Sequence, residues 1–219
     1  MNTELLITAD GSHTLFVPLL NECYHSTNGA KQESQHIFID AGLKQCLKQE
    51  ICVLEIGFGT GLNAFLTMVE AHKSKKTVHY TTLEYFPVEI EKALQLNFKD
   101  GYSPELKNAF IRLHSSEWNC KTQILPYFCL DKLHVDFTQY PLTEKYDVVF
   151  FDAFSPEKQA EMWTDKQFYK VFKHCNPQAI LTTYCAKGSV RRAMQEAGFV
   201  VERLPGPPGK REILRAIKK

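Results

Sequence analysis

The stretch Glu55-Ile56-Gly57-Phe58-Gly59-Thr60-Gly61 decides the fold of this 219-residue chain. It begins at the end of a continuous apolar run, Ile51–Ile56, and leads into Leu62–Lys73, where apolar residues recur at helical spacing. A strand, a glycine-rich turn and a helix in this order let backbone N–H groups approach a ligand closely. The pattern therefore predicts a binding loop between a buried parallel strand and the helix that follows it.

The spacing of the glycines indicates which ligand the loop holds. A dinucleotide-binding loop has its third glycine one residue later, where this chain has Leu62, and a phosphate-binding loop needs a Gly-Lys-Ser/Thr triplet that this loop lacks. The remaining interpretation is a loop for the methionine part of S-adenosylmethionine, with a tight turn that binds nothing as the alternative. The residues of this region predicted to bind the cofactor are Glu55, Gly57, Phe58, Gly59, Gly61 and Asn63. Asn63 either reaches the methionine end of the cofactor or supports the turn.

Strand and helix patterns alternate from residue 51 onwards. Strands are predicted at residues 51–56, 78–83, 133–137, 147–151, 180–184, 199–204 and 212–217, and helices at 62–73, 88–97, 165–174 and 190–197. This alternation predicts an α/β fold over residues 51–219, Rossmann-like, with a mostly parallel seven-stranded sheet and helices on both faces.

Other stretches carry weaker local signals. Residues 1–50 are predicted to form a short N-terminal extension packed on the core, with strands at 15–19 and 36–39 and a short helix at 41–48. Ser189 is the predicted N-cap of the last helix. The stretch that holds Gly101 and Pro104 is predicted to be turn-rich.

Three carboxylates lie at the ends of predicted strands, where parallel α/β sheets bind their ligands. Glu84 is placed to accept both hydroxyls of a ribose, and Asp136 to accept a hydrogen bond from an adenine amino group. Asp152 follows the most apolar strand and should face the ligand crevice rather than the core. The alternatives are a surface acid for Glu84, a helix N-cap for Asp136 and a turn residue for Asp152.

Charge is distributed unevenly along the chain. The formal net charge is +1, but residues 187–219 hold nine basic and three acidic residues, so this segment carries 9 − 3 = +6 and the rest 1 − 6 = −5. A basic segment at one end suits a polyanionic partner, and a solvated surface of mixed charge is the equal alternative.

The remaining composition excludes several classes of protein. The seven cysteines form no CxxC pair and the histidines show no ligand spacing, so we expect reduced thiols and no metal site. The N-terminal residues do not resemble a signal peptide, and no apolar stretch approaches the roughly 18 residues of a membrane-spanning helix. We therefore expect a cytoplasmic protein without a membrane partner.

Longer motifs extend the pattern beyond the glycine loop. They are Tyr24-His25-Ser26, Gly29-Ala30 and Glu33-Ser34; Gly57-Phe58-Gly59-Thr60-Gly61-Leu62-Asn63; Glu84-Tyr85-Phe86-Pro87; Phe151-Asp152-Ala153-Phe154-Ser155-Pro156 with Met162-Trp163-Thr164; Val190-Arg191-Arg192 with Gln195-Glu196-Ala197-Gly198-Phe199; and Gly209-Lys210-Arg211-Glu212. In these motifs the chain resembles, nearly end to end, the methyltransferase half of the bifunctional MnmC family, which modifies the wobble uridine of certain tRNAs.

The resemblance implies a class I S-adenosylmethionine-dependent methyltransferase fold and N-methylation of 5-aminomethyl-2-thiouridine to the 5-methylaminomethyl form. Asp152 would then be the catalytic residue at the acceptor amine, and Tyr85, Ala153 and Asp152 would join the cofactor-binding set. An amine must lose a proton on methylation, while a nearby carboxylate favours its protonated form. We therefore expect Asp152 to orient the acceptor, with proton removal to Asp152 or to water left open.

Contacts to the RNA are also implied by the resemblance. Phe154 is expected to stack on the base or wall it in, and the alternative is a loop anchor in the core. Tyr24 and Gln32 are expected to close over the cofactor. The residues expected to contact the anticodon region of the tRNA, through its phosphates, are Lys158, Lys187, Arg191, Arg192, Lys210 and Arg211.

The bifunctional relatives also carry a flavin-dependent oxidase half, which these 219 residues do not include. We therefore expect no bound FAD. Either a separate oxidase supplies the aminomethyl substrate, or this chain acts on a related nucleoside. Two other functions stay open. One is a methyltransferase or aminopropyltransferase for a small-molecule amine, and the other is a non-catalytic protein that keeps the cofactor.

Overall fold

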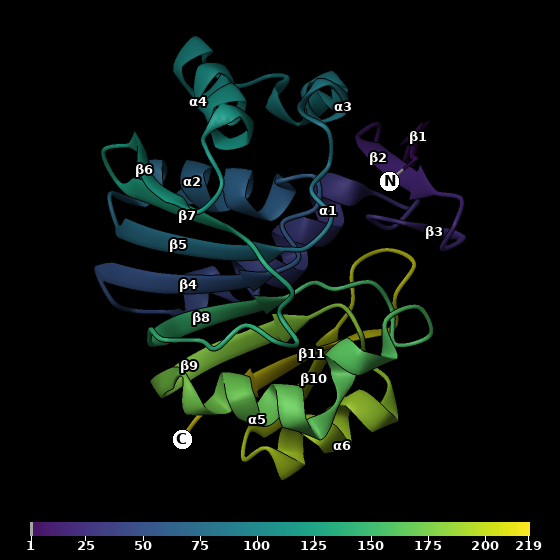
Figure 1. Cartoon of the computed structure of the whole chain (residues 1–219), viewed down its shortest axis with the longest axis vertical. Coiled ribbons are helices and arrows are strands. Elements are labelled where there is room, and N and C mark those ends of the chain that lie inside the picture. The colour runs from purple at the N-terminus through teal and green to yellow at the C-terminus, as the bar shows by residue number, and fades with distance from the viewer. Residues whose placement is uncertain (1) are drawn as a thin grey trace.

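The computed structural model describes residues 2–219 and places their strands in two sheets (Figure 1). A small antiparallel sheet near the N-terminus has the order β1-β2-β3, formed by β1 (Glu4–Ile7), β2 (His13–Val17) and β3 (Glu22–Cys23). Within the described residues the central sheet has eight strands in the order β10-β11-β9-β8-β4-β5-β7-β6. Its strands are β4 (Glu50–Ile56), β5 (Thr77–Glu84), β6 (Cys120–Leu125), β7 (Phe128–His134), β8 (Tyr146–Phe151), β9 (Cys175–Thr183), β10 (Val200–Pro205) and β11 (Glu212–Ile217).

The central sheet is parallel in its middle and antiparallel at both edges. The pairs β4–β5, β4–β8, β5–β7 and β8–β9 are parallel. The pairs β6–β7, β9–β11 and β10–β11 are antiparallel. The predicted α/β fold with a mostly parallel sheet is therefore confirmed, with one strand more than the seven expected.

Helices cover both faces of this sheet (Figure 1). They are α1 (Ala30–Ser34), α2 (Leu62–Ser74), α3 (Ile90–Gln95), α4 (Pro104–Ser115), α5 (Asp165–Lys173) and α6 (Gly188–Glu196), with shorter turns η1 (Gln35–Asp40), η2 (Leu43–Gln45), η3 (Asn97–Lys99) and η4 (Ala160–Trp163). Side chains of α2 and α4 pack in one buried cluster, and those of α5 and α6 pack in the other. Successive residues of β8 point to opposite faces, so Phe150 belongs to the first cluster and Phe151 to the second.

The strand predicted at 36–39 is wrong. These residues lie in η1, a segment of π-helix, and its middle residues Ile37, Phe38 and Ile39 are all buried. Three consecutive apolar residues suit a buried strand and a buried helix equally, so periodicity could not separate the two. The helix predicted at 41–48 is reduced to the single turn η2.

The turn predicted around Gly101 is confirmed, but Pro104 begins α4, and neither α4 nor β6 was predicted. The Ser103 hydroxyl accepts a hydrogen bond from the Leu106 N–H and Pro104 begins the helix, which is a start signal that the sequence did contain. The third strand is Phe128–His134 rather than 133–137, so Asp136 lies in the loop beyond it. The last helix begins at Gly188 after Lys187, and Ser189 is therefore not its cap.

The order in which successive strands are added to the sheet reverses between β4 and β8, although these two strands are parallel. The chain runs from β4 to β5 and β7 on one side, and β8 and β9 lie on the other. Such a reversal opens a crevice at the carboxyl ends of the two central strands. Here the Asp152 N–H donates to the Ile56 carbonyl at 3.0 Å and the Gly57 N–H donates to the Leu83 carbonyl at 2.9 Å, so three strand ends are tied together. Among residues 2–219, no helix combines the length and apolar character needed to span a bilayer.

Candidate functional site

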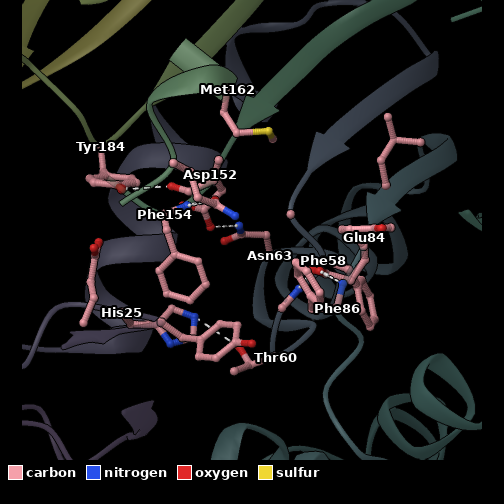
Figure 2. Close-up of a pocket in the computed structure, with 18 of the residues that line it drawn as sticks. His25, Phe58, Thr60, Asn63, Glu84, Phe86, Asp152, Phe154, Met162 and Tyr184 are labelled. Carbon is pink, nitrogen blue, oxygen red and sulfur yellow. Dashed lines mark hydrogen bonds between the residues drawn. The ribbon is translucent and has the colours of Figure 1, made fainter. Parts of the chain in front are cut away.

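A cavity of about 560 Å³ lies at the carboxyl ends of β4, β5 and β8. Its walls come from the glycine loop, from the segments after β5, β7 and β8, and from N-terminal residues 22–27. Figure 2 shows Asn63, Asp152 and Phe154 on one side of this cavity and Phe58, Glu84 and Phe86 on the other. The strand ends at which the sequence predicts ligand binding therefore border this cavity.

The glycine loop can form only because two positions lack side chains. Gly57 has a φ of +95°, and a Cβ there would lie 2.6 Å from the Asp152 carbonyl oxygen. Gly59 has a φ of +49°, and a Cβ there would lie 2.9 Å from the Tyr24 ring. Phe58 also lines the cavity, whereas Gly61 does not and instead precedes α2. The first two glycines thus keep the loop flat against the residues that flank it.

Glu84 is held at the cavity wall by two backbone donors. Its Oε2 accepts from the Gly59 N–H at 2.9 Å, and its Oε1 accepts from the Phe86 N–H at 2.8 Å. Each carboxylate oxygen can accept two hydrogen bonds, so one acceptor position on each oxygen stays available. This arrangement fits the two hydroxyls of a ribose.

Asp136 and Tyr85 lie at the same end of the cavity. The Asp136 Oδ1 accepts from both the N–H and the hydroxyl of Thr138, each at 2.7 Å, which fixes the carboxylate in a tight turn. Tyr85 and Phe86 are exposed aromatic residues whose ring centroids lie 4.6 Å apart. All three residues line the cavity, as does Ala153 on the opposite wall.

Asp152 is the most perturbed acid that faces the cavity. Its Oδ2 accepts a hydrogen bond of 2.8 Å from the Asn63 amide nitrogen, as Figure 2 shows. Burial raises the pKa of Asp152 to about 7, and the bond from Asn63 opposes this rise. A carboxyl group with this pKa exists in both protonation states near neutrality, which is what proton transfer requires.

Glu55 lies beneath the site and not in it. The side chain is fully buried and accepts a hydrogen bond of 2.7 Å from the Thr82 hydroxyl. Burial raises the pKa of Glu55 well above its ordinary value, and the hydrogen bond from Thr82 opposes this rise. Because Glu55 does not line the cavity, it supports the floor of the site instead of contacting a ligand there.

The N-terminal segment forms the wall of the cavity that faces Phe154. The Tyr24 ring packs edge-on against Phe154, with centroids 5.0 Å apart. Glu22 accepts from the N–H and the hydroxyl of Ser155 at 3.1 and 2.7 Å. Gln32, in contrast, is exposed and does not line the cavity, although its neighbour Glu33 does.

His25 connects this wall to the glycine loop. Its Nδ1 lies 3.2 Å from the Thr14 hydroxyl, and its Nε2 lies 3.2 Å from the Thr60 hydroxyl. Burial lowers the pKa of His25 to about 4, so the imidazole is neutral at neutral pH. A neutral ring that accepts at one nitrogen and donates at the other fits two hydroxyl partners.

The six basic residues expected to contact tRNA do not lie together. Lys210 lies inside the cavity, with its ammonium 3.4 Å from the Glu33 carboxylate. Lys187 pairs with Glu157, and Arg191 bonds to the Gln195 side chain at 3.2 Å. The other three, Lys158, Arg192 and Arg211, are exposed outside the cavity.

Several cavity residues were not predicted from the sequence. Glu33 and His25 stand in quoted motifs and could have been found there, but Glu22 and Tyr184 carry no local signal. The Tyr184 hydroxyl donates to the Ala153 carbonyl at 2.9 Å, next to Asp152. Within residues 2–219, no three His, Cys, Asp or Glu side chains gather in a way that could hold a metal ion.

Comparison with known proteins gives one family. The family described as S-adenosyl-L-methionine-dependent methyltransferase matches residues 110–219. The tRNA 5-methylaminomethyl-2-thiouridine biosynthesis bifunctional protein MnmC of Campylobacter hominis is 31% identical over 92% of this chain and 31% of its own length. The same-named protein of Cupriavidus necator is 31% identical over 94% of this chain and 33% of its own length. The chain thus spans about a third of the length of the curated relatives it matches.

Solved structures give the same result. The crystal structure of MNMC2 from Aquifex aeolicus has a TM-score of 0.79 and 26% identity, and the match covers 98% of this chain and 70% of that chain. A spermidine synthase has a TM-score of 0.60 at 13% identity, covering 100% of this chain and 72% of that chain. This second likeness shows the fold alone.

Proposed function

Because the chain belongs to the family of S-adenosyl-L-methionine-dependent methyltransferases that matches residues 110–219, we propose that it methylates a primary amine on tRNA. The proposed acceptor is 5-aminomethyl-2-thiouridine at the wobble position, and the product is the 5-methylaminomethyl form. The observation that carries the proposal is the half-buried Asp152 beside the aromatic pair Phe154 and Tyr24 in one cavity. The names of the relatives support the choice of nucleoside.

The residues present fit the cofactor. The flat loop at Gly57–Gly59 gives its methionine part close access to the backbone, Glu84 offers two acceptor positions to the ribose, and Asp136 offers Oδ2 to the adenine amino group. When bound, the cofactor supplies a methyl group on a positively charged sulfur. The chain's own task is to align an acceptor nitrogen with that group and to exclude water.

Asp152 orients the acceptor and takes its proton in this proposal. The Asn63 amide holds one carboxylate oxygen at 2.8 Å, which leaves the other to accept a hydrogen bond from the amine. Because burial raises the pKa of Asp152 to about 7, the carboxylate is basic enough to accept the proton that nitrogen loses. Phe154 and Tyr24 provide aromatic surface against which a uracil ring that has left the base stack can pack.

The exposed basic residues are the proposed contacts to the RNA backbone. Lys158, Arg192 and Arg211 lie on the surface outside the cavity, where they can meet phosphates without entering the site. Such contacts make affinity fall as salt increases. Lys187 and Lys210 are engaged by Glu157 and Glu33, so we assign them a smaller share of this role.

The test is transfer of labelled methyl from S-adenosylmethionine to tRNA isolated from cells that lack the methyltransferase but retain the oxidase. We expect label in 5-methylaminomethyl-2-thiouridine, loss of that label with Asp152→Ala, and normal labelling with Asp165→Asn, an acid outside the cavity. Label in a free amine and none in tRNA would replace this proposal with a small-molecule methyltransferase. Cofactor binding without any transfer would indicate a non-catalytic protein.

A further inference from the structure

A single ion pair lies inside the cavity on its acceptor side. The Lys210 ammonium is 3.4 Å from Glu33 Oε1 and 4.8 Å from the centroid of the Tyr184 ring. Glu33 Oε2 accepts a hydrogen bond of 2.7 Å from the Ser26 N–H. The two side chains are 28% and 10% exposed. Among the described residues that line the cavity, Lys210 is the only lysine or arginine.

The loop between β10 and β11 directs Lys210 inward. The Lys210 N–H donates to the Pro207 carbonyl at 2.9 Å, and Gly206 closes the loop by donating to the Arg211 carbonyl at 3.1 Å. A Cβ at Gly209 would lie 2.0 Å from the Asn28 side chain, so the loop packs directly on the N-terminal segment. The next residue, Arg211, is 94% exposed, so the neighbouring cations of this loop lie in different environments.

Lys210 and Glu33 are the charged groups that set the potential at Asp152. Behind Asp152, burial raises the pKa values of Glu55 and Tyr80 well above their ordinary values. Beside it, burial also raises the pKa values of Tyr184 and Cys185, so Tyr80, Tyr184 and Cys185 are neutral near pH 7. The carboxylate of Glu22, which also lines the cavity, accepts hydrogen bonds from the N–H and the hydroxyl of Ser155.

The two charges act on Asp152 in opposite directions. Burial is the main cause of the raised pKa of Asp152, and the Asn63 hydrogen bond opposes it. Glu33 adds to the rise, whereas Lys210 lowers the pKa again. A cation at this position also repels a second cation that enters the site.

On the basis of the proposed function, we propose that Lys210 determines the charge state in which the acceptor amine is bound. The ammonium held between Glu33 and the Tyr184 ring disfavours another ammonium beside Asp152. This repulsion offsets the preference of the Asp152 carboxylate for a protonated amine, so the site takes the neutral amine. The nitrogen lone pair then forms the bond to the methyl carbon, and the electron pair of the broken carbon–sulfur bond stays on sulfur. The nitrogen becomes a secondary ammonium, and Asp152 takes its proton.

The test compares kcat against pH for the wild type and charge variants, with cofactor and aminomethyl-bearing anticodon hairpin both saturating. The acid limb of kcat reports groups in the bound complex. Lys210→Met should move this limb to higher pH by about half to one unit, so that kcat at pH 6.5 falls about three- to tenfold and approaches the wild-type value above pH 9. Glu33→Gln should move the limb to lower pH. Lys210→Arg keeps the positive charge and should therefore show the acid limb at the wild-type pH.

Arg203→Gln is the control, because it removes a cation of β10 that pairs with Glu212 outside the cavity and has no proposed contact to RNA or cofactor. It should leave the limb in place. A second measurement needs no turnover. Calorimetry measures the Kd of two hairpins, one with a neutral hydroxymethyl group and one with a permanently charged trimethylammoniomethyl group. The wild type should bind the neutral hairpin more tightly. Lys210→Met should reduce the ratio of the two Kd values about three- to tenfold. Cofactor affinity measured in the same way verifies that each variant is folded.

The outcomes separate the two proposals. If the wild type transfers no methyl to the hairpin, the proposed function is wrong. If the wild type is active but Lys210→Met leaves the limb unmoved or lowers it, or if Glu33→Gln shifts it in the same direction as Lys210→Met, Lys210 does not have the assigned role. A purely structural role for the pair predicts that both variants lower kcat at all pH values without opposite shifts.

Discussion

Glu84 ends the parallel strand β5, Asp152 follows the parallel strand β8, and both line the cavity, but they are held in different ways. Glu84 accepts from two backbone N–H groups, one on each oxygen. Asp152 accepts from one side-chain amide, that of Asn63, and burial raises its pKa to about 7. The first arrangement suits a permanent acceptor, and the second suits a group that gains and loses a proton.

The same difference extends to the two halves of the cavity. In the proposed function, one half of the cavity holds the cofactor and the other holds the acceptor. The proposed cofactor half is built from the glycine loop and the end of the next strand, which are close in the sequence. The proposed acceptor half combines the N-terminal wall, the loop after β8, Tyr184 and Lys210, which are far apart in the sequence. The cofactor half therefore depends on backbone geometry, whereas the acceptor half depends on how side chains from distant segments meet.

The largest expected effect separates proton transfer from binding at Asp152. Asp152→Asn keeps an oxygen that can accept from Asn63 but removes the ability to take a proton. We expect kcat to fall by about 10²- to 10⁴-fold, the usual contribution of a general base. Cofactor affinity, measured by calorimetry, should change less than about tenfold because this change lies in the acceptor half. A kcat within a few-fold of the wild type would show that water takes the proton.

The opposite pattern is expected at Glu84. Glu84→Gln replaces one carboxylate oxygen with an amide nitrogen, which cannot accept from the Gly59 or Phe86 N–H. We expect the cofactor Kd to rise about ten- to a hundredfold, in line with about 1.5–3 kcal/mol for hydrogen bonds to a charged group. At saturating cofactor, kcat should stay well above that of Asp152→Asn. An unchanged Kd would remove Glu84 from the cofactor site.

Asn63→Leu tests the single side-chain donor of Asp152. The Asn63 bond lowers the pKa of Asp152, so its loss should raise the pKa above about 7 and move the acid limb of kcat to higher pH. We expect a shift of about half to one unit, corresponding to a three- to tenfold lower rate on the acid side. The pH profile of Glu84→Gln is the control and should keep the wild-type limb. Coincident limbs for Asn63→Leu and the wild type would contradict the role of this bond.

The smallest effect concerns stability. The folded-state pKa of Asp152 lies above the ordinary value of 3.8, so the folded protein binds more protons than the unfolded chain between about pH 4 and 7. The free energy of unfolding therefore decreases as pH rises through this window, and the loss is complete above it. Asp152→Asn should raise the free energy of unfolding at pH 8 and change it by nearly nothing at pH 3.5. Urea unfolding at the two pH values measures the difference in free energy of unfolding between the variant and the wild type. An equal difference at both pH values would indicate an effect of packing instead of charge.

The signals from which the sequence predicts the glycine loop and the acids at the strand ends are local. The apolar run before Gly57, the glycine spacing and the acid at the end of the next strand each act over a few residues, and Glu84 and Asp136 both line the cavity. The misplaced Glu55 shows the limit of this method. Its position next to the glycines suggests ligand contact, but side chains of a strand alternate between faces, and Glu55 faces the buried interior.

The acceptor half shows what local patterns could not provide. Lys210 and Arg211 are adjacent and have the same charge, so the sequence assigned them one role, on the RNA backbone. The structure places the Lys210 ammonium against Glu33 inside the cavity and leaves Arg211 in solvent. The pairing depends on the contact between the β10–β11 loop and the N-terminal segment at Asn28, which no sequence periodicity encodes.

By itself, the sequence determined the α/β class, the order of strands and helices along most of the chain, the glycine loop and the acids at the strand ends. These features follow from hydrophobic periodicity and backbone freedom, which act between near neighbours. Only the tertiary structure decided that β8 lies beside β4, so that Asp152 lies next to the glycine loop, and that Glu22, Tyr24 and Glu33 cover the acceptor side. The buried environment that raises the pKa of Asp152 is likewise a property of the packed chain, because desolvation depends on everything that surrounds the carboxyl group.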